Sequence, residues 1–286
     1  MINASLIQMD VAPLDPAMNL RRIHDHIAAE SSRGARLVLF PELANTGYVE
    51  PLVPGGAMTL PPADYAAALH AACATPDGPE IAALAEAAQR HGCHIVIGMG
   101  LRDPLREGVM RNCSVLIGPQ GVLGCYAKIH QWQNEKLYFT RGDRIDSFAF
   151  GETRLGMQIC YDIRFPEITR ILAMQGAGIV TSVWASFGAE DAPVADEALF
   201  LHRAYTRAVE NGVFFLSCNR SGSTGGQRFF GRSCALAPDG TVLGALDHDH
   251  EDVLRVKIDL SQIARYRGFT GIWADRAPEI YAKYFP

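Results

Sequence analysis

The chain has 286 residues, of which 48% are hydrophobic and 20% are charged, and its formal net charge is −5. This composition is ordinary for a globular enzyme, and an acidic balance without a run of Lys or Arg argues against a nucleic-acid partner. No segment approaches the roughly 18–20 apolar residues of a membrane-spanning helix, and the N-terminus lacks a secretory signal pattern, so we expect a cytoplasmic protein without a membrane partner.

Cysteine and histidine spacing argue against metal sites. The seven cysteines are scattered and form no Cys-x-x-Cys pair, which predicts reduced thiols and no structural zinc. The pairs His24/His26 and His248/His250 have i, i+2 spacing, which does not place both rings on one helical face. We therefore expect surface histidines rather than metal ligands.

Short apolar runs alternate with amphipathic segments in the first half of the chain. Residues 4–9 predict a strand, and Leu20, Ile23 and Ile27 predict a helix that closes at Gly34. The continuous apolar run at 35–42 predicts a strand covered on both faces. The predictions that follow are a helix over 80–91 and strands over 94–100, 113–121 and 121–130, the last two joined by a hairpin at Pro119-Gln120-Gly121.

The second half continues the alternation. It predicts strands over 154–160, 177–186, 212–219, 233–240 and 251–260, and helices over 166–176 and 196–211. This pattern is typical of an α/β protein with a mixed sheet, or two packed sheets, and helices outside. No linker divides the chain, so residues 1–262 are expected to form one domain. The aromatic tail 263–286 is expected to pack as an arm on the body or on a neighbouring subunit.

Three chemically complementary residues follow apolar runs. Glu42, Lys128 and Cys160 each lie at the carboxyl end of a predicted strand, where sites of open α/β sheets usually lie. A thiolate can attack a carbonyl carbon, a carboxylate can carry its proton, and an ammonium can stabilise the oxyanion. Taken singly, each has an ordinary alternative: a core thiol, a loop carboxylate and a strand-end lysine. Cys93, Cys113, Cys125, Cys218 and Cys234 are interpreted as core thiols of that ordinary kind, whereas Cys73 lies in an Ala-rich segment without such context.

The segments FPELANTGY around Glu42, YAKIHQW around Lys128 and GMQICYDIRFPE around Cys160 resemble the three signature blocks of the nitrilase superfamily of carbon–nitrogen hydrolases. The resemblance covers about residues 4–260. It implies a four-layer α-β-β-α sandwich, assembly into homodimers or higher homo-oligomers, and a thiol mechanism without a metal or organic cofactor.

The resemblance also implies roles for individual residues. Glu42 is the general base and acid, Lys128 the oxyanion stabiliser and Cys160 the nucleophile, with the backbone N–H of Tyr161 as a second oxyanion donor. Glu135 matches a second glutamate of many members, although a solvated glutamate would look the same.

Further residues are expected around these positions. The resemblance implies that Glu210 and Asn211 form buried hydrogen bonds which support the site, and His130 is expected beside Lys128 in a supporting role. Glu167 lies in the first turn of the helix predicted over 166–176, where its carboxylate interacts favourably with the helix dipole, so a supporting role is expected rather than a catalytic one. Segments 44–65 and 186–197 are predicted loops that shape the pocket entrance.

The resemblance implies a small linear amide or N-carbamoyl substrate. Nitrile-cleaving members typically carry Trp-Glu after the cysteine, whereas this chain has Tyr161-Asp162. Arg164 suits recognition of a substrate carboxylate, with a structural ion pair to Glu167 as an equal alternative. Trp184, together with Phe187, is a candidate for an apolar pocket wall, with a core role as the alternative. A nitrilase, a thiol-dependent acyltransferase and a non-catalytic binding relative are the rival interpretations.

Overall fold

The computed structural model describes residues 1–48, 62–188, 198–224 and 226–284. Within these ranges, no helix has both the length and the apolar character needed to cross a membrane. Predicted segments 44–65 and 186–197 lie partly outside the described residues.

The first sheet combines parallel and antiparallel strands. Its strand order is β15-β1-β2-β3-β4-β5. β1, β2 and β3 are parallel, whereas β4 and β5 each turn back on their neighbour. β2 and β5 therefore end at the same edge. The strands are β1 (Ile2–Gln8), β2 (Leu37–Leu39), β3 (His94–Arg102), β4 (Met110–Gly118), β5 (Gly121–Ala127) and β15 (Asp252–Ile258).

The second sheet has the order β14-β13-β10-β8-β7-β6. β7, β8 and β10 form its parallel centre. Its strands are β6 (Ser147–Phe150), β7 (Thr153–Ile159), β8 (Ala177–Trp184), β10 (Phe214–Asn219), β13 (Cys234–Leu236) and β14 (Val242–Ala245). A third, smaller sheet has the order β11-β12-β9 and consists of β9 (Phe187–Gly188), β11 (Ser223–Thr224) and β12 (Gln227–Phe229).

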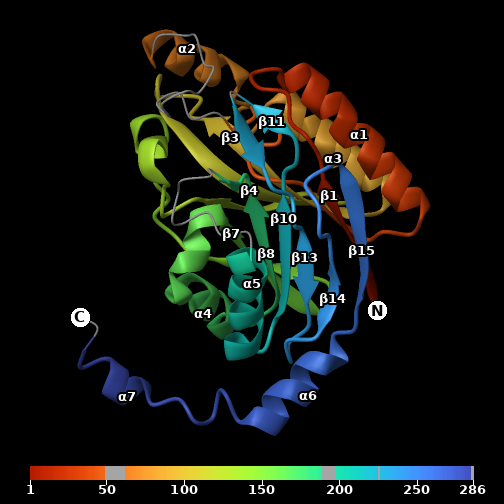
Figure 1. Ribbon diagram of the computed structural model, residues 1–286, viewed down its shortest axis with the longest axis vertical. Helices are drawn as coiled ribbons and strands as arrows, with labels where there is room; N and C mark the ends of the chain where they lie inside the picture. Colours follow the sequence, from red (N-terminus) through yellow and green to blue (C-terminus); the bar gives the residue numbers. More distant parts are fainter. Residues whose placement is uncertain (49–61, 189–197, 225, 285–286) are drawn as a thin grey trace.

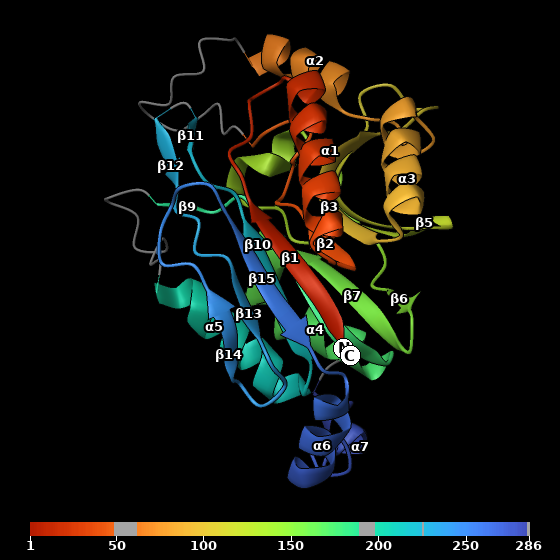
Figure 2. The ribbon, with the colours of Figure 1, turned by 90° about the vertical axis from the view of Figure 1, so that its right-hand side faces the viewer.

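The two large sheets pack face to face between two pairs of helices. α1 (Pro16–Ser32) and α3 (Pro79–His91) cover the first sheet, and α4 (Pro166–Met174) and α5 (Ala198–Asn211) cover the second (Figures 1 and 2). One apolar cluster, which includes Leu39 and Ile159, lies between the sheets, and two further clusters lie under the helix pairs. The predicted four-layer α-β-β-α sandwich is confirmed.

The tail leaves the sandwich through α6 (Ser261–Thr270) and α7 (Pro278–Tyr281), which lie below the two sheets in Figure 1. Arg267 ties α6 to the body because its guanidinium donates hydrogen bonds to the carbonyl oxygens of Gly212 at 2.9 Å and Ala177 at 3.1 Å. Phe269 in α6 remains exposed, as do Ile280 and Tyr284 beyond that helix.

Several sequence predictions need correction. The strand predicted over 35–42 ends at Leu39, because Phe40 and Pro41 leave the sheet to begin the turn that carries Glu42. The predicted loop 44–65 is wrong at its end, where α2 (Pro62–Ala72) begins. Within the predicted loop 186–197, Phe187–Gly188 forms the short strand β9. β6 and β14 were not predicted.

Candidate active site

Glu42 is completely buried at the carboxyl edge of the first sheet. Its Oε1 accepts hydrogen bonds from Lys128 Nζ at 2.7 Å and Asn112 Nδ2 at 2.6 Å, and its Oε2 accepts one from the backbone N–H of Ala185 at 2.9 Å. The N–H of Glu42 donates to the carbonyl oxygen of Trp184 at 3.2 Å. Asn112 lies on β4 and Lys128 directly follows β5, both in the first sheet, whereas Ala185 directly follows β8 in the second sheet. Both sheets therefore hold this carboxylate.

Lys128 lies between two carboxylates. Its Nζ donates to Glu42 Oε1 and, at 2.8 Å, to Oε1 of Glu135, which lies on the 3-10 helix η1 (Gln133–Leu137). Burial alone would lower the pKa of Lys128, but the two negative charges outweigh it and hold the pKa above its ordinary value. Burial raises the pKa of Glu135 to about 7. Lys128 is therefore a fixed cation at neutral pH.

Cys160 begins the 3-10 helix η2 (Cys160–Arg164) directly after β7. Its φ of 44° is in the left-handed region, which a side chain with a Cβ rarely occupies and which is common at strained functional turns. Burial, followed by the charge of Glu42, raises the pKa of the thiol well above its ordinary value, while Lys128 acts in the opposite sense. The structure thus brings together the three predicted strand-end residues and places the predicted Glu135 beside them.

Asp162 holds the turn behind the nucleophile, a feature that the sequence did not predict. Its buried carboxylate accepts hydrogen bonds from the Tyr126 hydroxyl at 2.7 Å, the Ile159 N–H at 3.2 Å and the His130 N–H at 3.0 Å. The His130 ring stacks on Phe165 with centroids 3.5 Å apart. The supporting position expected for His130 is therefore confirmed, and Asp162 is its partner.

Helix α5 supports the same turn from the other side. Arg207 donates from Nε and a terminal nitrogen to the carbonyl oxygen of Ile163, at 3.0 and 2.7 Å, and forms an ion pair with Glu210 at 2.8 Å. The buried Asn211 amide donates to the Arg207 carbonyl oxygen at 2.9 Å. The hydrogen bonds predicted for Glu210 and Asn211 are present, but only Asn211 is buried, because the Glu210 side chain is 32% exposed. Glu167 lies exposed in the first turn of α4, at the favourable end of the helix dipole.

Aromatic rings surround the predicted specificity residue. The Arg164 guanidinium lies 5.3 Å from the ring centroid of Trp132 and 5.4 Å from that of Tyr161. Tyr161 is the second residue of η2, and the first N–H groups of a helix have no intrahelical acceptor. Its position therefore agrees with the predicted oxyanion donor, which stays a prediction.

The two candidates for an apolar wall differ in position. The Trp184 side chain is only 3% exposed and packs on Phe200 beneath α5, with centroids 4.7 Å apart, so the geometry favours the core role. Phe187 lies with Tyr48 and Phe229, at centroid distances of 6.0 and 5.8 Å. A contact of Trp184 with substrate stays a prediction, and its observed contribution is the carbonyl oxygen that holds Glu42.

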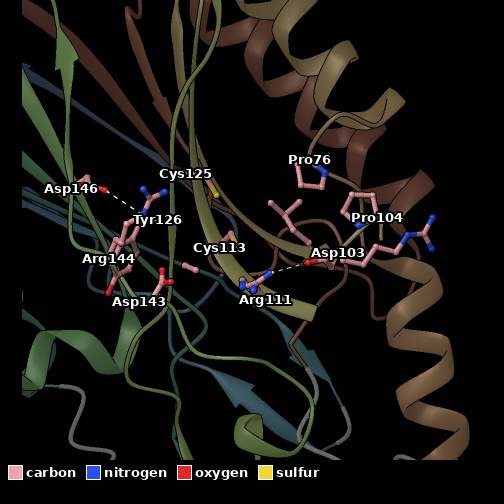
Figure 3. Close-up of a pocket in the computed structure, with 13 residues that line it drawn as sticks. Pro76, Asp103, Pro104, Arg111, Cys113, Cys125, Tyr126, Asp143, Arg144 and Asp146 are labelled. Carbon is pink, nitrogen blue, oxygen red and sulfur yellow. Dashed lines mark ion pairs between the residues drawn. The ribbon is translucent and has the colours of Figure 1, made fainter. Parts of the chain in front are cut away.

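The interpretation of Cys125 as a core thiol is wrong, because this residue is exposed. It lies on the edge strand β5, at a pocket of about 320 Å³ that also includes Cys113 (Figure 3). The ion pairs Arg111–Asp103 at 3.7 Å and Arg144–Asp146 at 3.9 Å border this pocket. In the described part of the chain, no group of three or more His, Cys, Asp or Glu side chains could hold a metal ion.

Comparisons with known proteins agree with this geometry. The family model described as carbon-nitrogen hydrolase matches residues 3–268. The chain is 31% identical to a nitrilase of Pyrococcus abyssi, over 98% of this chain and 99% of the relative. It is 29% identical to the 2-oxoglutaramate amidase of Bacillus subtilis, over 97% of this chain and 98% of the relative.

A solved amidase structure also resembles this chain. A mutant of the amidase from Nesterenkonia sp. AN1, with acrylamide added at its active site cysteine, matches with a TM-score of 0.76 and 27% identity, covering 100% of each chain. The Glu42–Lys128–Cys160 cluster lies in a fold shared with these proteins, at the positions that the sequence blocks predict. The chain therefore belongs to the carbon–nitrogen hydrolase family of the nitrilase superfamily.

Proposed function

We propose that the protein hydrolyses a small linear amide or N-carbamoyl compound through a thioester on Cys160. The observation that carries this proposal is the lysine held between two buried carboxylates beside a half-buried thiol. This arrangement offers a proton acceptor, a fixed positive charge and a nucleophile within one buried site. The amidases named among its relatives support the same reaction class.

The first step needs a base because the thiol is the resting form of Cys160. Burial raises the pKa of this thiol, so little thiolate exists at neutral pH before substrate binds. The Glu42 carboxylate takes the proton as the sulfur attacks the substrate carbonyl carbon. The S–H electron pair stays on sulfur and forms the new S–C bond.

The negative charge that develops on the carbonyl oxygen then needs a partner. Lys128 is cationic and is fixed by Glu42 and Glu135 before the reaction starts, so it stabilises the oxyanion with little reorganisation. We propose the backbone N–H of Tyr161 as the second donor. Loss of one such donor typically slows catalysis by about 10²–10³-fold.

Collapse of the tetrahedral intermediate breaks the C–N bond. Glu42 returns its proton to the nitrogen, and ammonia or an amine leaves the thioester behind. Glu42 then takes a proton from water, whose oxygen attacks the thioester carbonyl. The C–S bond breaks, the proton returns to sulfur, and the acid is released.

We propose that the substrate carries a carboxylate. Arg164 follows the nucleophile by four residues and is held against two aromatic rings, one of them Tyr161, next to Cys160. A guanidinium in this position suits bidentate recognition of a carboxylate at the site entrance. The name of the 2-oxoglutaramate amidase relative points to an acidic amide substrate for that protein.

A substrate panel tests this proposal. Ammonia release is measured with neutral amides, ω-amides of dicarboxylic acids, N-carbamoyl amino acids and nitriles. We expect turnover of amides or carbamoyl compounds, faster when a carboxylate is present. Turnover of nitriles alone would overturn the proposal, because the nitrilase relative would then be the better guide. Transfer of the acyl group to added amines in preference to water would identify an acyltransferase.

We further propose that the protein works as a homo-oligomer in the cytoplasm. All seven cysteines are free, which supports a reducing compartment. The exposed side chains of Phe269, Ile280 and Tyr284 in the tail support burial against a second copy. Light scattering of the full chain should give at least a dimer, and a monomer at micromolar concentration would contradict this.

A further inference from the structure

Asn112 touches two members of the candidate active site through two different atoms. It lies on β4, is completely buried, and its Nδ2 donates to Oε1 of Glu42 at 2.6 Å. Its backbone carbonyl oxygen accepts the N–H of Lys128 at 2.8 Å. One residue on a rigid strand therefore fixes the side chain of the proposed base and the backbone of the proposed cation.

The hydrogen bonds at Glu42 distinguish its two oxygens. A carboxylate oxygen has two lone pairs, and Oε1 accepts from both Asn112 and Lys128. Oε2 accepts only from the N–H of Ala185 among the hydrogen bonds of the described residues. A proton that arrives at Glu42 can therefore bind Oε2 without displacing a donor, whereas at Oε1 it would displace one.

We infer that Asn112 is a positioning residue that, together with Lys128, occupies Oε1 of Glu42 so that Oε2 takes the Cys160 proton. This inference rests on the proposed function, in which Glu42 is the base. The S–H bond breaks as an O–H bond forms on Oε2, and the sulfur keeps the electron pair for the substrate carbon. Asn112 gains and loses no proton in this step.

The amide suits this task because it is a neutral donor. A second cation in its place would compete with Lys128 for the carboxylate and would repel the Lys128 ammonium. The Oδ1 atom of Asn112 is buried and has no hydrogen-bond partner among the described residues. Buried polar atoms in folded proteins normally have a hydrogen-bond partner. An acceptor without one does not stabilise the fold, so a role of this amide in the active site explains its presence better than a role in stability. Turning the amide over would place this oxygen against Glu42 Oε1, which the negative charge there disfavours.

Two substitutions separate a positioning role from a structural one. Asn112→Leu keeps the approximate volume but removes the donor, and we expect kcat to fall about 10²-fold with little change in KM. Asn112→Asp can donate to Glu42 only when its carboxyl is protonated. Its activity should therefore survive only on the acid side of the wild-type profile. The titratable groups facing Glu42 are Lys128, Glu135 and Cys160, and both variants leave all three in place.

Ser5→Ala is the matched control, because Ser5 is another buried neutral donor to a buried carboxylate, that of Glu30 at 3.0 Å, outside the active site. Its kcat and pH profile should equal those of the wild type. Parallel pH profiles for Asn112→Leu and Asn112→Asp, or an unchanged kcat in a folded Asn112→Leu, would overturn the inference.

A second readout keeps this test separate from the proposed function. Iodoacetamide modification of Cys160, followed by peptide mapping, reports deprotonation of the thiol without any turnover. Asn112→Leu should slow this modification at neutral pH, whereas Ser5→Ala should not. If the wild type hydrolyses no compound in the panel but Asn112→Leu slows alkylation, the proposed function fails and the inference stands. If turnover and alkylation are both unchanged, the inference is wrong and the function stands.

Discussion

Gly98 on β3 lies directly against the backbone that carries the proposed base. Its N–H donates to the Pro41 carbonyl oxygen at 3.2 Å, and its own carbonyl oxygen accepts from the Ala44 N–H at 2.7 Å. A Cβ added at this position would lie 2.5 Å from both the Glu42 Cα and the Pro41 oxygen. Ordinary contacts begin at 3.4 Å, so Gly98→Ala must displace the Glu42 turn by about 1 Å.

The expected effect follows from this displacement. Misplacement of a catalytic group by about 1 Å costs about 10²-fold in rate, which equals about 2.7 kcal/mol of transition-state stabilisation. Overpacking should also lower the free energy of unfolding by about 1–3 kcal/mol. Steady-state kinetics of ammonia release, with circular dichroism and a thermal melt, measure both effects. We expect kcat to carry most of the loss, because the substitution moves the base rather than the specificity residue.

Gly268→Ala provides the control, since no atom lies within 4 Å of its added Cβ and it is in the exposed helix α6. Its kcat should be unchanged, and its stability should be equal to or slightly above that of the wild type. A folded Gly98→Ala with kcat within twofold of the wild type would refute the argument that the Glu42 backbone position limits catalysis.

Three further predictions follow from the site and its surroundings. Burial raises the pKa of Glu135 from 4.5 to about 7, so the folded chain binds this proton more tightly than the unfolded chain. The protonated carboxyl therefore contributes its full share to the free energy of unfolding below pH 4.5. That contribution, at most about 3 kcal/mol, is lost as the pH rises to 7. Urea unfolding of Glu135→Gln should not show this loss, and identical pH trends in both proteins would contradict the raised pKa. Arg164→Ala should raise KM at least tenfold for carboxylated amides but not for neutral ones, because only the former lose an ionic partner; equal losses for both kinds would indicate a structural role. A maleimide should modify the exposed Cys125 in folded Cys160→Ala protein, and peptide mapping that finds the label only on other cysteines would contradict its exposure.

The sequence predicted the parts of the fold that repeat locally. Ile23 and Ile27 at helical spacing marked α1, and the apolar runs before Lys128 and Cys160 marked β5 and β7. α2 was missed because its Ala-rich turns contrast little between buried and exposed faces. Cys125 was misjudged because an edge strand leaves one face partly uncovered, which the apolar pattern of the strand itself does not report.

Some residues of the candidate site are recognisable in sequence motifs, whereas other contacts of the site exist only in the folded structure. Glu42, Lys128, Glu135 and Cys160 could be predicted because each lies in a recognisable block at a strand end or just after one. Asn112 could not, because its partner Glu42 is 70 residues away in the chain. The contribution of Ala185 is a backbone N–H, which no residue type encodes. Asp162 stands inside a recognised block, but its link to Tyr126 depends on the packing of the two sheets.

The central claim is that the Cys160 sulfur forms a covalent bond to the substrate carbonyl. Rapid acid quenching during amide turnover, followed by intact-protein mass measurement and peptide mapping, tests it directly. The account predicts a mass increase equal to the acyl group on the peptide that contains Cys160, with loss of both adduct and ammonia release in folded Cys160→Ala. Undiminished ammonia release by that variant would contradict the account.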